Sequence, residues 1–188
     1  EVWYKTSVDH GITWSSPVNI TSQVHFNANS ERPELVWRTH ANTPGHALQF
    51  EKGEYRGRIY IPANHSQGSP QEDFNEYKAY GFYSDDHGQN WQLGGTTPND
   101  QVNECTVAEL PNGELLLNMR NYARKERQTR QVAMSKDGGL TWEDQRFDTQ
   151  LPEPRCQGAL LNVKKKGKNL LLFTNPADGK SRMNMTLS

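Results

Sequence analysis

Glu104 and Arg120 are the two residues of this sequence whose types and spacing could do chemistry together. They bound the stretch "ECTVAELPNGELLLNMR", in which two β-rich runs flank a Pro-Asn-Gly turn. With a two-residue Asn-Gly turn, Arg120 faces Cys105, and Glu104 meets Arg120 at the open end of one hairpin. A longer turn shifts the register by one residue, so the prediction is proximity and not a particular face. The pair could be a base beside an anion-binding guanidinium, or a salt bridge at a strand end.

The other charged residues near this hairpin are expected to take no part in chemistry. Glu109 lies near the turn, and we expect water to solvate it. Arg124, Arg127 and Arg130 belong to the polar connection "NYARKERQTR", which is typical of surface charge. Farther along the chain, Arg182 in "KSRMNMT" is either a solvated loop residue or a member of a site.

Short β-rich runs must position these residues, because helical periodicity is nearly absent. Gly, Asn, Asp and Pro separate the runs, and the polar segment "ANHSQGSPQEDFN" is expected to be a loop. The pattern therefore predicts an all-β protein. The expected strands are Val2–Ser7, Ala47–Glu51, Arg58–Pro62, Tyr77–Ser84, Cys105–Leu110, Leu115–Arg120, Gln131–Ser135, Ala159–Val163, Leu170–Thr174 and Met183–Ser188.

One octapeptide, Ser-x-Asp-x-Gly-x-x-Trp, occurs three times, at residues 7–14, 84–91 and 135–142. Its Asp can accept backbone N–H bonds across a turn, its Gly supplies a positive φ, and its Trp can pack between sheets. Nothing in it pairs a nucleophile with a base. We therefore predict that each copy is a structural fastener that joins the third and fourth strands of a sheet.

The spacing of the octapeptides predicts a β-propeller. Successive copies are far enough apart to hold a four-stranded blade of about 40–50 residues and a loop. Within a single domain, 1–188, we expect blades at roughly 1–20, 44–95, 104–147 and 157–188. A closed propeller needs about four to eight blades, so this chain should form an open arc with unpaired strand edges.

The octapeptide resembles the Asp box (BNR repeat) of the sialidases, or neuraminidases, and longer segments agree with it. "NECTVAELPNGELLLNMRN", residues 103–121, is similar to the sialidase segment that carries a catalytic Glu and an Arg. Residues 44–66 resemble the blade before it, and "RCQGALL" (155–161) and "LLFTNPADGKSRMNMTLS" (171–188) resemble the blade after it. The resemblance covers nearly the whole chain. It implies a six-bladed propeller, of which this chain holds roughly three to three and a half blades.

The same resemblance implies an activity and a set of site residues. The family comprises retaining exo-α-sialidases, which hydrolyse terminal sialic acid from glycoproteins, glycolipids or oligosaccharides, and no cofactor or metal is implied. By motif, Glu104 is the base that activates a nucleophilic Tyr. Arg120 and Arg182 are the second and third of three arginines that clamp the sialic acid carboxylate, for which a planar guanidinium is well suited.

Three functional residues of the family have no match in this chain. The first clamp Arg and the acid/base Asp precede the first Asp box in the family, and the nucleophilic Tyr follows the last segment seen here. Arg58 in "GRIYIP" lies after the first box, and no Tyr of the chain is in a matching context. We therefore expect the isolated chain to be inactive.

Two other functions stay open. The chain could belong to a non-catalytic Asp-box propeller that binds glycans or protein partners, or to an Asp-box glycosidase that uses two carboxylates. Glu104 with Arg120 and Arg182 in matching segments favours the sialidase. No second Asp or Glu of this chain suits a carboxylate pair.

Composition excludes some classes of partner. The formal net charge of −1 gives no overall field that would attract nucleic acid. The longest apolar runs, such as Leu170–Phe173, are too short to span a membrane. Two cysteines make no disulfide framework, and we expect two buried thiols. Sequons at Asn19, Asn64 and Asn184 are weak evidence for secretion, so lysosomal, extracellular and bacterial settings are all compatible. The chain opens inside an expected strand with no initiator Met, which indicates a piece of a longer protein.

Overall fold

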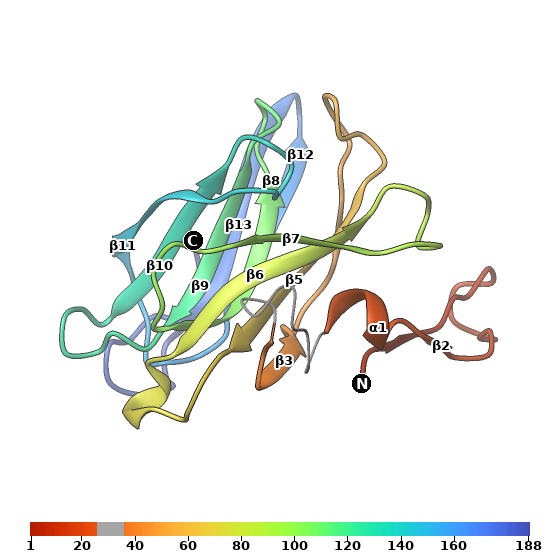
Figure 1. The fold of residues 1–188 in the computed structure, drawn as a ribbon. Coiled ribbons are helices and arrows are strands. Elements are labelled where there is room, and N and C mark those ends of the chain that lie inside the picture. The colour runs from red at the N-terminus through yellow and green to blue at the C-terminus, as the bar shows by residue number, and fades with distance from the viewer. Residues whose placement is uncertain (26–35) are drawn as a thin grey trace.

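The computed structural model describes residues 1–25 and 36–188, except for the side chain of Asp73, and shows antiparallel sheets that follow one another along the chain (Figure 1). The first pairs β1 (Trp3–Tyr4) with β2 (Val18–Asn19). The second holds β3 (Thr39–Asn42), β4 (Leu48–Gln49), β5 (Ile59–Ser66), β6 (Tyr77–Ser84) and β7 (Gln92–Thr96). The third holds β8 (Val102–Glu109), β9 (Leu115–Asn121), β10 (Thr129–Ser135) and β11 (Glu143–Pro152). The fourth holds β12 (Ala159–Lys165), β13 (Lys168–Pro176) and β14 (Met185–Leu187). Two helices of about one turn, α1 (Thr21–Val24) and η2 (Glu72–Phe74), lie between strands.

Each octapeptide turns the chain between two paired strands: β1 and β2, β6 and β7, or β10 and β11. In the third copy, Asp137 Oδ1 accepts the N–H groups of Leu140 (3.0 Å) and Thr141 (2.9 Å). Ser135 Oγ accepts the N–H of Gly139 at 2.9 Å, and Gly139 has a φ of +88°. The predicted hairpin chemistry is therefore confirmed. Because β10 and β11 are the third and fourth strands of their sheet, the predicted position of this turn is confirmed too.

The tryptophans of the three octapeptides differ in burial. Trp91 and Trp142 are buried, as predicted, whereas Trp14 is 59% exposed. Trp142 Nε1 donates to the Gly95 carbonyl in β7 of the neighbouring sheet at 3.0 Å, so this copy ties two sheets together. The prediction of a buried Trp is wrong for the first copy, because within residues 1–25 and 36–188 Trp14 lacks the packing that Tyr4 and Phe82 give to the Trp91 ring.

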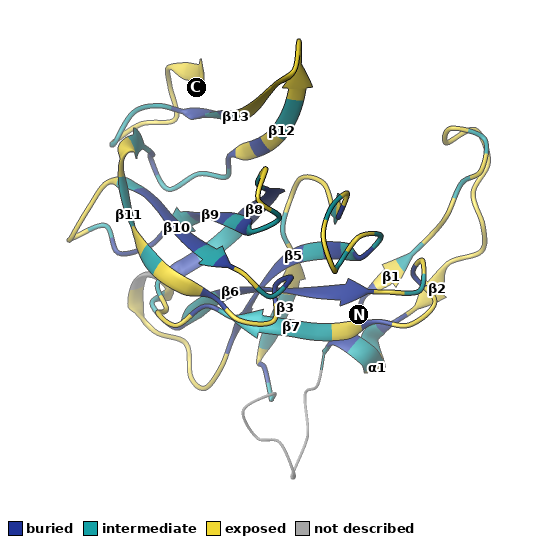
Figure 2. Ribbon diagram, turned by 90° about the horizontal axis from the view of Figure 1, so that it is seen from above, coloured by how far each residue is buried: buried dark blue, intermediate teal, exposed yellow. Residues whose placement is uncertain are grey.

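The main core lies between the second and third sheets, which stack with the fourth in chain order (Figure 2). Strand β8 is central in this stack and packs against β5 on one side and β12 on the other. Because β8 has neighbours on both sides, it is buried along most of its length. The core between the sheets is built mainly from large apolar side chains and includes Tyr60, Val107, Leu117, Met119 and Trp142.

Several strands differ from the expected ranges. Strand β5 continues through Ser66, so the first residues of the expected polar loop are buried strand residues, Asn64 and His65 among them. The polar residues gave no strand signal in the sequence, because the strand is stabilised by pairing with β6 along its whole length and not by intrinsic propensity. Burial also makes Asn64 unsuitable as a glycosylation acceptor. Strands β2 and β3 were not expected, since each is short and depends on a distant partner strand.

Trp37 belongs to a second core cluster, with Val2 and Ile20 beside the first hairpin. The buried His65 and the half-buried His40 stack on its ring. The ring centroid of His65 is 4.1 Å from that of Trp37, and that of His40 is 6.4 Å away. Burial lowers the pKa of His40 to about 4 and that of His65 to about 3. Both rings are therefore neutral at physiological pH.

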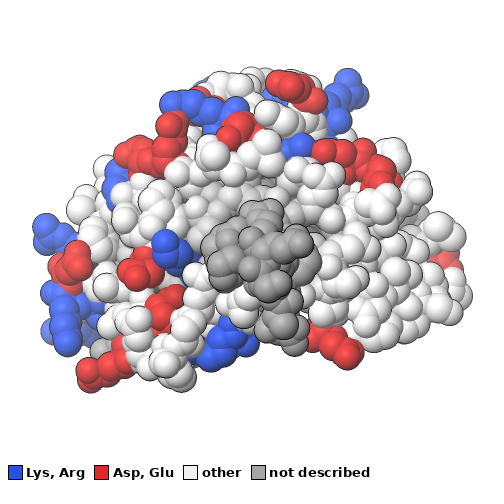
Figure 3. All heavy atoms as spheres, viewed as in Figure 1, with Lys and Arg blue, Asp and Glu red and all other residues white. Residues whose placement is uncertain are grey.

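The surface carries both signs of charge. Figure 3 shows acidic and basic side chains mixed along the left and upper edges, while the right of this face is largely uncharged. No helix among the described residues is both long enough and apolar enough to cross a bilayer.

Candidate functional site

Glu104 and Arg120 form a direct ion pair across two neighbouring strands. Arg120 Nη1, from β9, donates to Glu104 Oε2, from β8, at 2.6 Å. The side chains are 16% and 25% exposed, so the pair borders solvent at one end of the sheet. The predicted proximity is confirmed.

The register of this hairpin is the longer-turn alternative. Leu110 donates to the carbonyl of Glu114 at 2.8 Å, which leaves a three-residue turn with Gly113 at a φ of +88°. Cys105 therefore pairs with Met119 and not with Arg120, and the pairing expected for a two-residue turn is wrong. A bulge between Val102 and Cys105 then shifts the ladder by one residue, and Glu104 lies within it. Bulges re-aim side chains, and this one places Glu104 beside Arg120.

Arg120 has hydrogen-bonding capacity left over. Its Nε is buried, and within the described parts of the chain it has no hydrogen-bond partner. A buried donor without an acceptor costs free energy, so a ligand acceptor at this point would be favourable.

Tyr122 lies next to the ion pair and was not selected from the sequence. The Arg120 guanidinium carbon is 5.1 Å from the centroid of the Tyr122 ring, and that of Arg155 is 5.0 Å from the same centroid. Tyr122 is buried, and burial raises its pKa, while the two arginines act in the opposite direction. Strand periodicity could have found Tyr122, because it follows Arg120 by two residues and so points to the same side. No sequence signal identified Arg155, which comes from the connection between β11 and β12.

Arg182 lies in the exposed connection between β13 and β14. Its Nη2 donates to the backbone carbonyl of Arg155 at 3.4 Å. Between the described residues, no hydrogen bond or ion pair joins Arg182 directly to Glu104 or Arg120. The structure thus brings two of the three predicted site residues into contact and links the third to them only indirectly, through Arg155 and the ring of Tyr122.

Two of the three arginines that were predicted to be surface charges are buried or half-buried. Arg130 is fully buried, and its Nε donates to Asn118 Oδ1 at 2.6 Å. Arg124 is half-buried, and its Nη1 donates to the carbonyl of Glu153 at 2.6 Å. Both lie 3.6 Å from the carboxylate of Glu153, which is itself fully buried. Burial lowers the pKa of Arg130 to about 10 and lowers that of Arg124. The prediction failed because Glu153, the partner of both, is distant in sequence; only Arg127 is exposed as expected.

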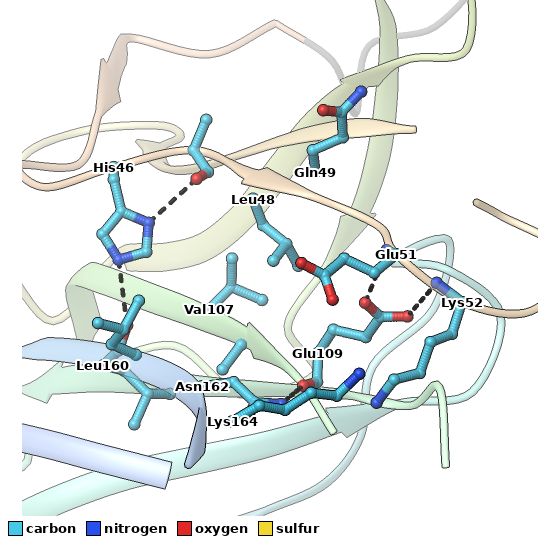
Figure 4. Close-up of a pocket in the computed structure, with 13 residues that line it drawn as sticks. His46, Leu48, Gln49, Glu51, Lys52, Val107, Glu109, Leu160, Asn162 and Lys164 are labelled. Carbon is cyan, nitrogen blue, oxygen red and sulfur yellow. Dashed lines mark hydrogen bonds between the residues drawn. The ribbon is translucent and has the colours of Figure 1, made fainter. Parts of the chain in front are cut away.

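Glu109 is also not solvated as predicted. It is 4% exposed, and its carboxylate accepts the N–H groups of Glu51 (2.8 Å) and Lys52 (3.1 Å). These bonds hold the connection after β4 against β8 and border a cavity of about 270 Å³ between β4, β8 and β12 (Figure 4). The cavity lies at the opposite end of β8 from Glu104 and includes neither member of the ion pair. We therefore separate it from the candidate site.

Arg58 and the two cysteines also lie outside the candidate site. Arg58 is buried and binds both carboxylate oxygens of Asp85, at 2.8 and 2.9 Å, which agrees with leaving it out of the site. Cys105 is a buried free thiol, as predicted, and burial raises its pKa to about 12. Cys156 is also free, but it is only half-buried, so the prediction of two buried thiols is wrong for this residue.

A family model described as a BNR repeat-like domain matches residues 1–188. The chain belongs to the BNR repeat-like domain family. Among curated relatives, it is 33% identical over 186 residues to a sialidase of Bacteroides fragilis and 31% identical over 188 residues to Sialidase-2 of Cricetulus griseus. Both alignments cover 96% of this chain, but only 30% of the first protein and 47% of the second. This chain therefore spans less than a third of the length of the first relative and less than half of the second.

Solved structures agree with the family assignment. The Hadza microbial sialidase Hz136 superposes with a TM-score of 0.77 and 28% identity, covering 98% of this chain and 33% of that one. A Trypanosoma rangeli sialidase in complex with the inhibitor DANA superposes with a TM-score of 0.70 at 20% identity over 98% of this chain and 29% of that one, a likeness of fold alone. This chain is thus part of an all-β propeller of the sialidase type, as the sequence predicted. Its division into complete blades stays a prediction.

Proposed function

We propose that this chain is part of an exo-α-sialidase, which hydrolyses terminal α-linked sialic acid from glycoproteins, glycolipids or oligosaccharides. The observation that carries the proposal is the Glu104–Arg120 pair, partly exposed to solvent at one end of a sheet in a chain whose relatives are sialidases. A salt bridge with only a structural role would not need Arg120 Nε to be buried without an acceptor.

In this proposal Arg120 and Arg182 bind the sialic acid carboxylate. Arginine is always charged and offers a planar fork of donors that matches a carboxylate. Arg120 already uses Nη1 on Glu104, so its remaining N–H groups address the substrate. Arg182 is exposed on the connection that leads into β14 and supplies a second guanidinium.

Glu104 acts as the base for a tyrosine nucleophile supplied from outside this chain. A tyrosine with a pKa near ~10 is a weak nucleophile at neutral pH unless a base removes its proton. Glu104 Oε2 accepts the Arg120 bond, which leaves Oε1 to take that proton. The phenolic oxygen then bonds to the anomeric carbon as the bond to the leaving sugar oxygen breaks. An Asp outside this chain protonates the leaving oxygen and later activates the water that releases sialic acid.

Hydrolysis of a fluorogenic α-sialoside by the full-length protein that carries this chain tests the proposal. Glu104→Gln should lower kcat by about 100-fold or more, since general base catalysis typically contributes that much. Arg120→Ala and Arg182→Ala should lower kcat/KM, while the exposed Arg127→Ala serves as the matched control. The isolated 188-residue chain should show no turnover.

The second candidate is a non-catalytic propeller that binds sialylated glycans. Saturable binding of 3′-sialyllactose with no turnover at any pH from 4 to 8 would favour it over the enzyme. Robust turnover by the isolated chain, lost in Glu104→Gln, would show that the catalytic set is complete within these residues and would contradict the assignment of roles outside them.

A further inference from the structure

Arg155 lies between the two proposed clamp residues. Its guanidinium carbon is 5.0 Å from the centroid of the Tyr122 ring, which also carries the Arg120 guanidinium at 5.1 Å. Its backbone carbonyl accepts a bond from Arg182 Nη2 at 3.4 Å. One residue therefore touches the third sheet through its side chain and the connection carrying Arg182 through its backbone.

We propose that Arg155 is a further substrate-binding residue, which places a third guanidinium of this chain on the anionic group that Arg120 and Arg182 bind. The inference rests on the proposed function and deepens it, because it concerns how the same site holds a sialoside. Arginine is always charged and presents a planar fork of donors that matches a carboxylate, so a guanidinium beside the Tyr122 ring suits this role.

Hydrogen bonds to the buried Glu153 and to two arginines fix the backbone on both sides of Arg155. The buried Glu153 accepts the N–H of Asn121 at 3.1 Å and the N–H of Cys156 at 2.8 Å. Arg130 donates to the carbonyl of Cys156 and Arg124 to that of Glu153. Glu153 and Cys156, on either side of Arg155, are thus fixed by hydrogen bonds to the third sheet and its connections. A preorganised binding residue requires such a fixed backbone.

The same contacts join Arg155 to the rest of the site. Arg124 also donates through Nη2 to the carbonyl of Gly179, which lies three residues before Arg182. Asn175, at the end of β13, donates to the carbonyl of Pro152 at 2.7 Å. The connections 152–156 and 176–182 are therefore anchored to each other as well as to β9.

The backbone of Arg155 is in a conformation that arginine rarely adopts. Its φ is +60°, in the left-handed region that disfavours residues with a Cβ. Such conformations persist where surrounding contacts over-determine them, and they cluster at functional sites. Here the cost is offset by the Glu153 contacts, and the result is a half-buried side chain at the Tyr122 ring.

Ligand binding to the full-length protein that carries this chain tests the inference. The variants are Arg155→Gln, which keeps a long polar side chain without charge, Arg155→Lys, which keeps the charge without the fork, and the control Arg127→Ala. The probes are the α-methyl glycoside of sialic acid and its methyl ester, which lacks the negative charge. Thermal melting of each variant establishes that it is folded.

We expect Arg155→Gln to weaken binding of the α-methyl sialoside about tenfold, which corresponds to ~1.4 kcal/mol. Arg155→Lys should retain part of the affinity, and binding of the methyl ester should be unchanged by either substitution. In turnover of a fluorogenic sialoside, KM should rise while kcat changes less than about twofold, because Arg155 touches no reacting atom.

Other results separate the two proposals. Tight binding by the wild type with unchanged affinity in Arg155→Gln overturns the inference about Arg155 alone. An equal loss for the charged sialoside and its ester overturns the carboxylate contact in favour of a general structural role. If the wild type neither binds nor hydrolyses the sialoside, the proposed function fails, and the role of Arg155 fails with it.

Discussion

Trp142 and Trp14 occupy the same position in two copies of one octapeptide, so their substitution measures what tertiary packing adds to a shared motif. Trp142 is 5% exposed, and it packs edge-on against Tyr60 with ring centroids 6.3 Å apart. Its Nε1 donates to Gly95 in the neighbouring sheet at 3.0 Å. Trp14 is 59% exposed, and its Nε1 bonds within its own turn, to Gly11 at 3.1 Å.

The expected costs follow from these environments. Truncation of a buried tryptophan typically costs about 3–5 kcal/mol, and loss of the bond to Gly95 adds about 1 kcal/mol. We therefore expect Trp142→Ala to lower the free energy of unfolding by about 4–6 kcal/mol. Trp14→Ala should cost about 1 kcal/mol, because most of its ring is already in water. Trp142→Phe keeps most of the apolar area and removes the bond, so its cost should lie between the two.

Urea denaturation of the 188-residue chain, followed by circular dichroism, provides the measurement. The slope of the transition should be the same in all variants, so that the midpoints report stability alone. Equal losses for Trp142→Ala and Trp14→Ala would refute the reasoning. That result would mean that the octapeptide contributes through its local turn and not through contact between sheets.

Three further predictions concern other buried features. Glu153→Gln should cost about 3–5 kcal/mol in urea denaturation, because it leaves the fully buried Arg130 and the half-buried Arg124 without their counter-charge, whereas the exposed Glu126→Gln should cost almost nothing. Gly139→Ala should lower the melting temperature far more than Gly113→Ala, although both residues have a φ of +88°. An added Cβ would lie 2.2 Å from the Tyr60 ring at position 139 but in open space at position 113. Burial lowers the pKa of His65 to about 3, so the unfolded state binds a proton more readily than the folded state. The His65 contribution to the free energy of unfolding should therefore be complete above pH ~6.5, and the free energy should fall by about 2–3 kcal/mol at pH 4.5. The fall should be smaller in His65→Gln.

The proximity of Glu104 and Arg120 could be predicted from the sequence, because a hairpin with a recognisable turn links them. Their strands are adjacent and their turn is local, so the prediction was uncertain only by one residue of register. The three-residue turn and the bulge that settled the register depend on pairing along the whole ladder, which no local pattern reports. Tyr122, which directly follows β9, was accessible to the same reasoning through the period of two of the expected strand.

The sequence by itself determined the all-β class and the three fastening turns, because both follow from interactions within about eight residues. A tight turn between two strands needs its Ser, Asp and Gly near one another in the chain, so the pattern can be recognised in the sequence. The tertiary structure alone decided which tryptophans are buried and that Arg130 and Glu153 form a fully buried pair. It also decided that Arg155 lies at the Tyr122 ring beside Arg120 and accepts a hydrogen bond from Arg182. These outcomes depend on partners tens of residues away, since burial and charge pairing are properties of the assembled sheets and not of any one segment.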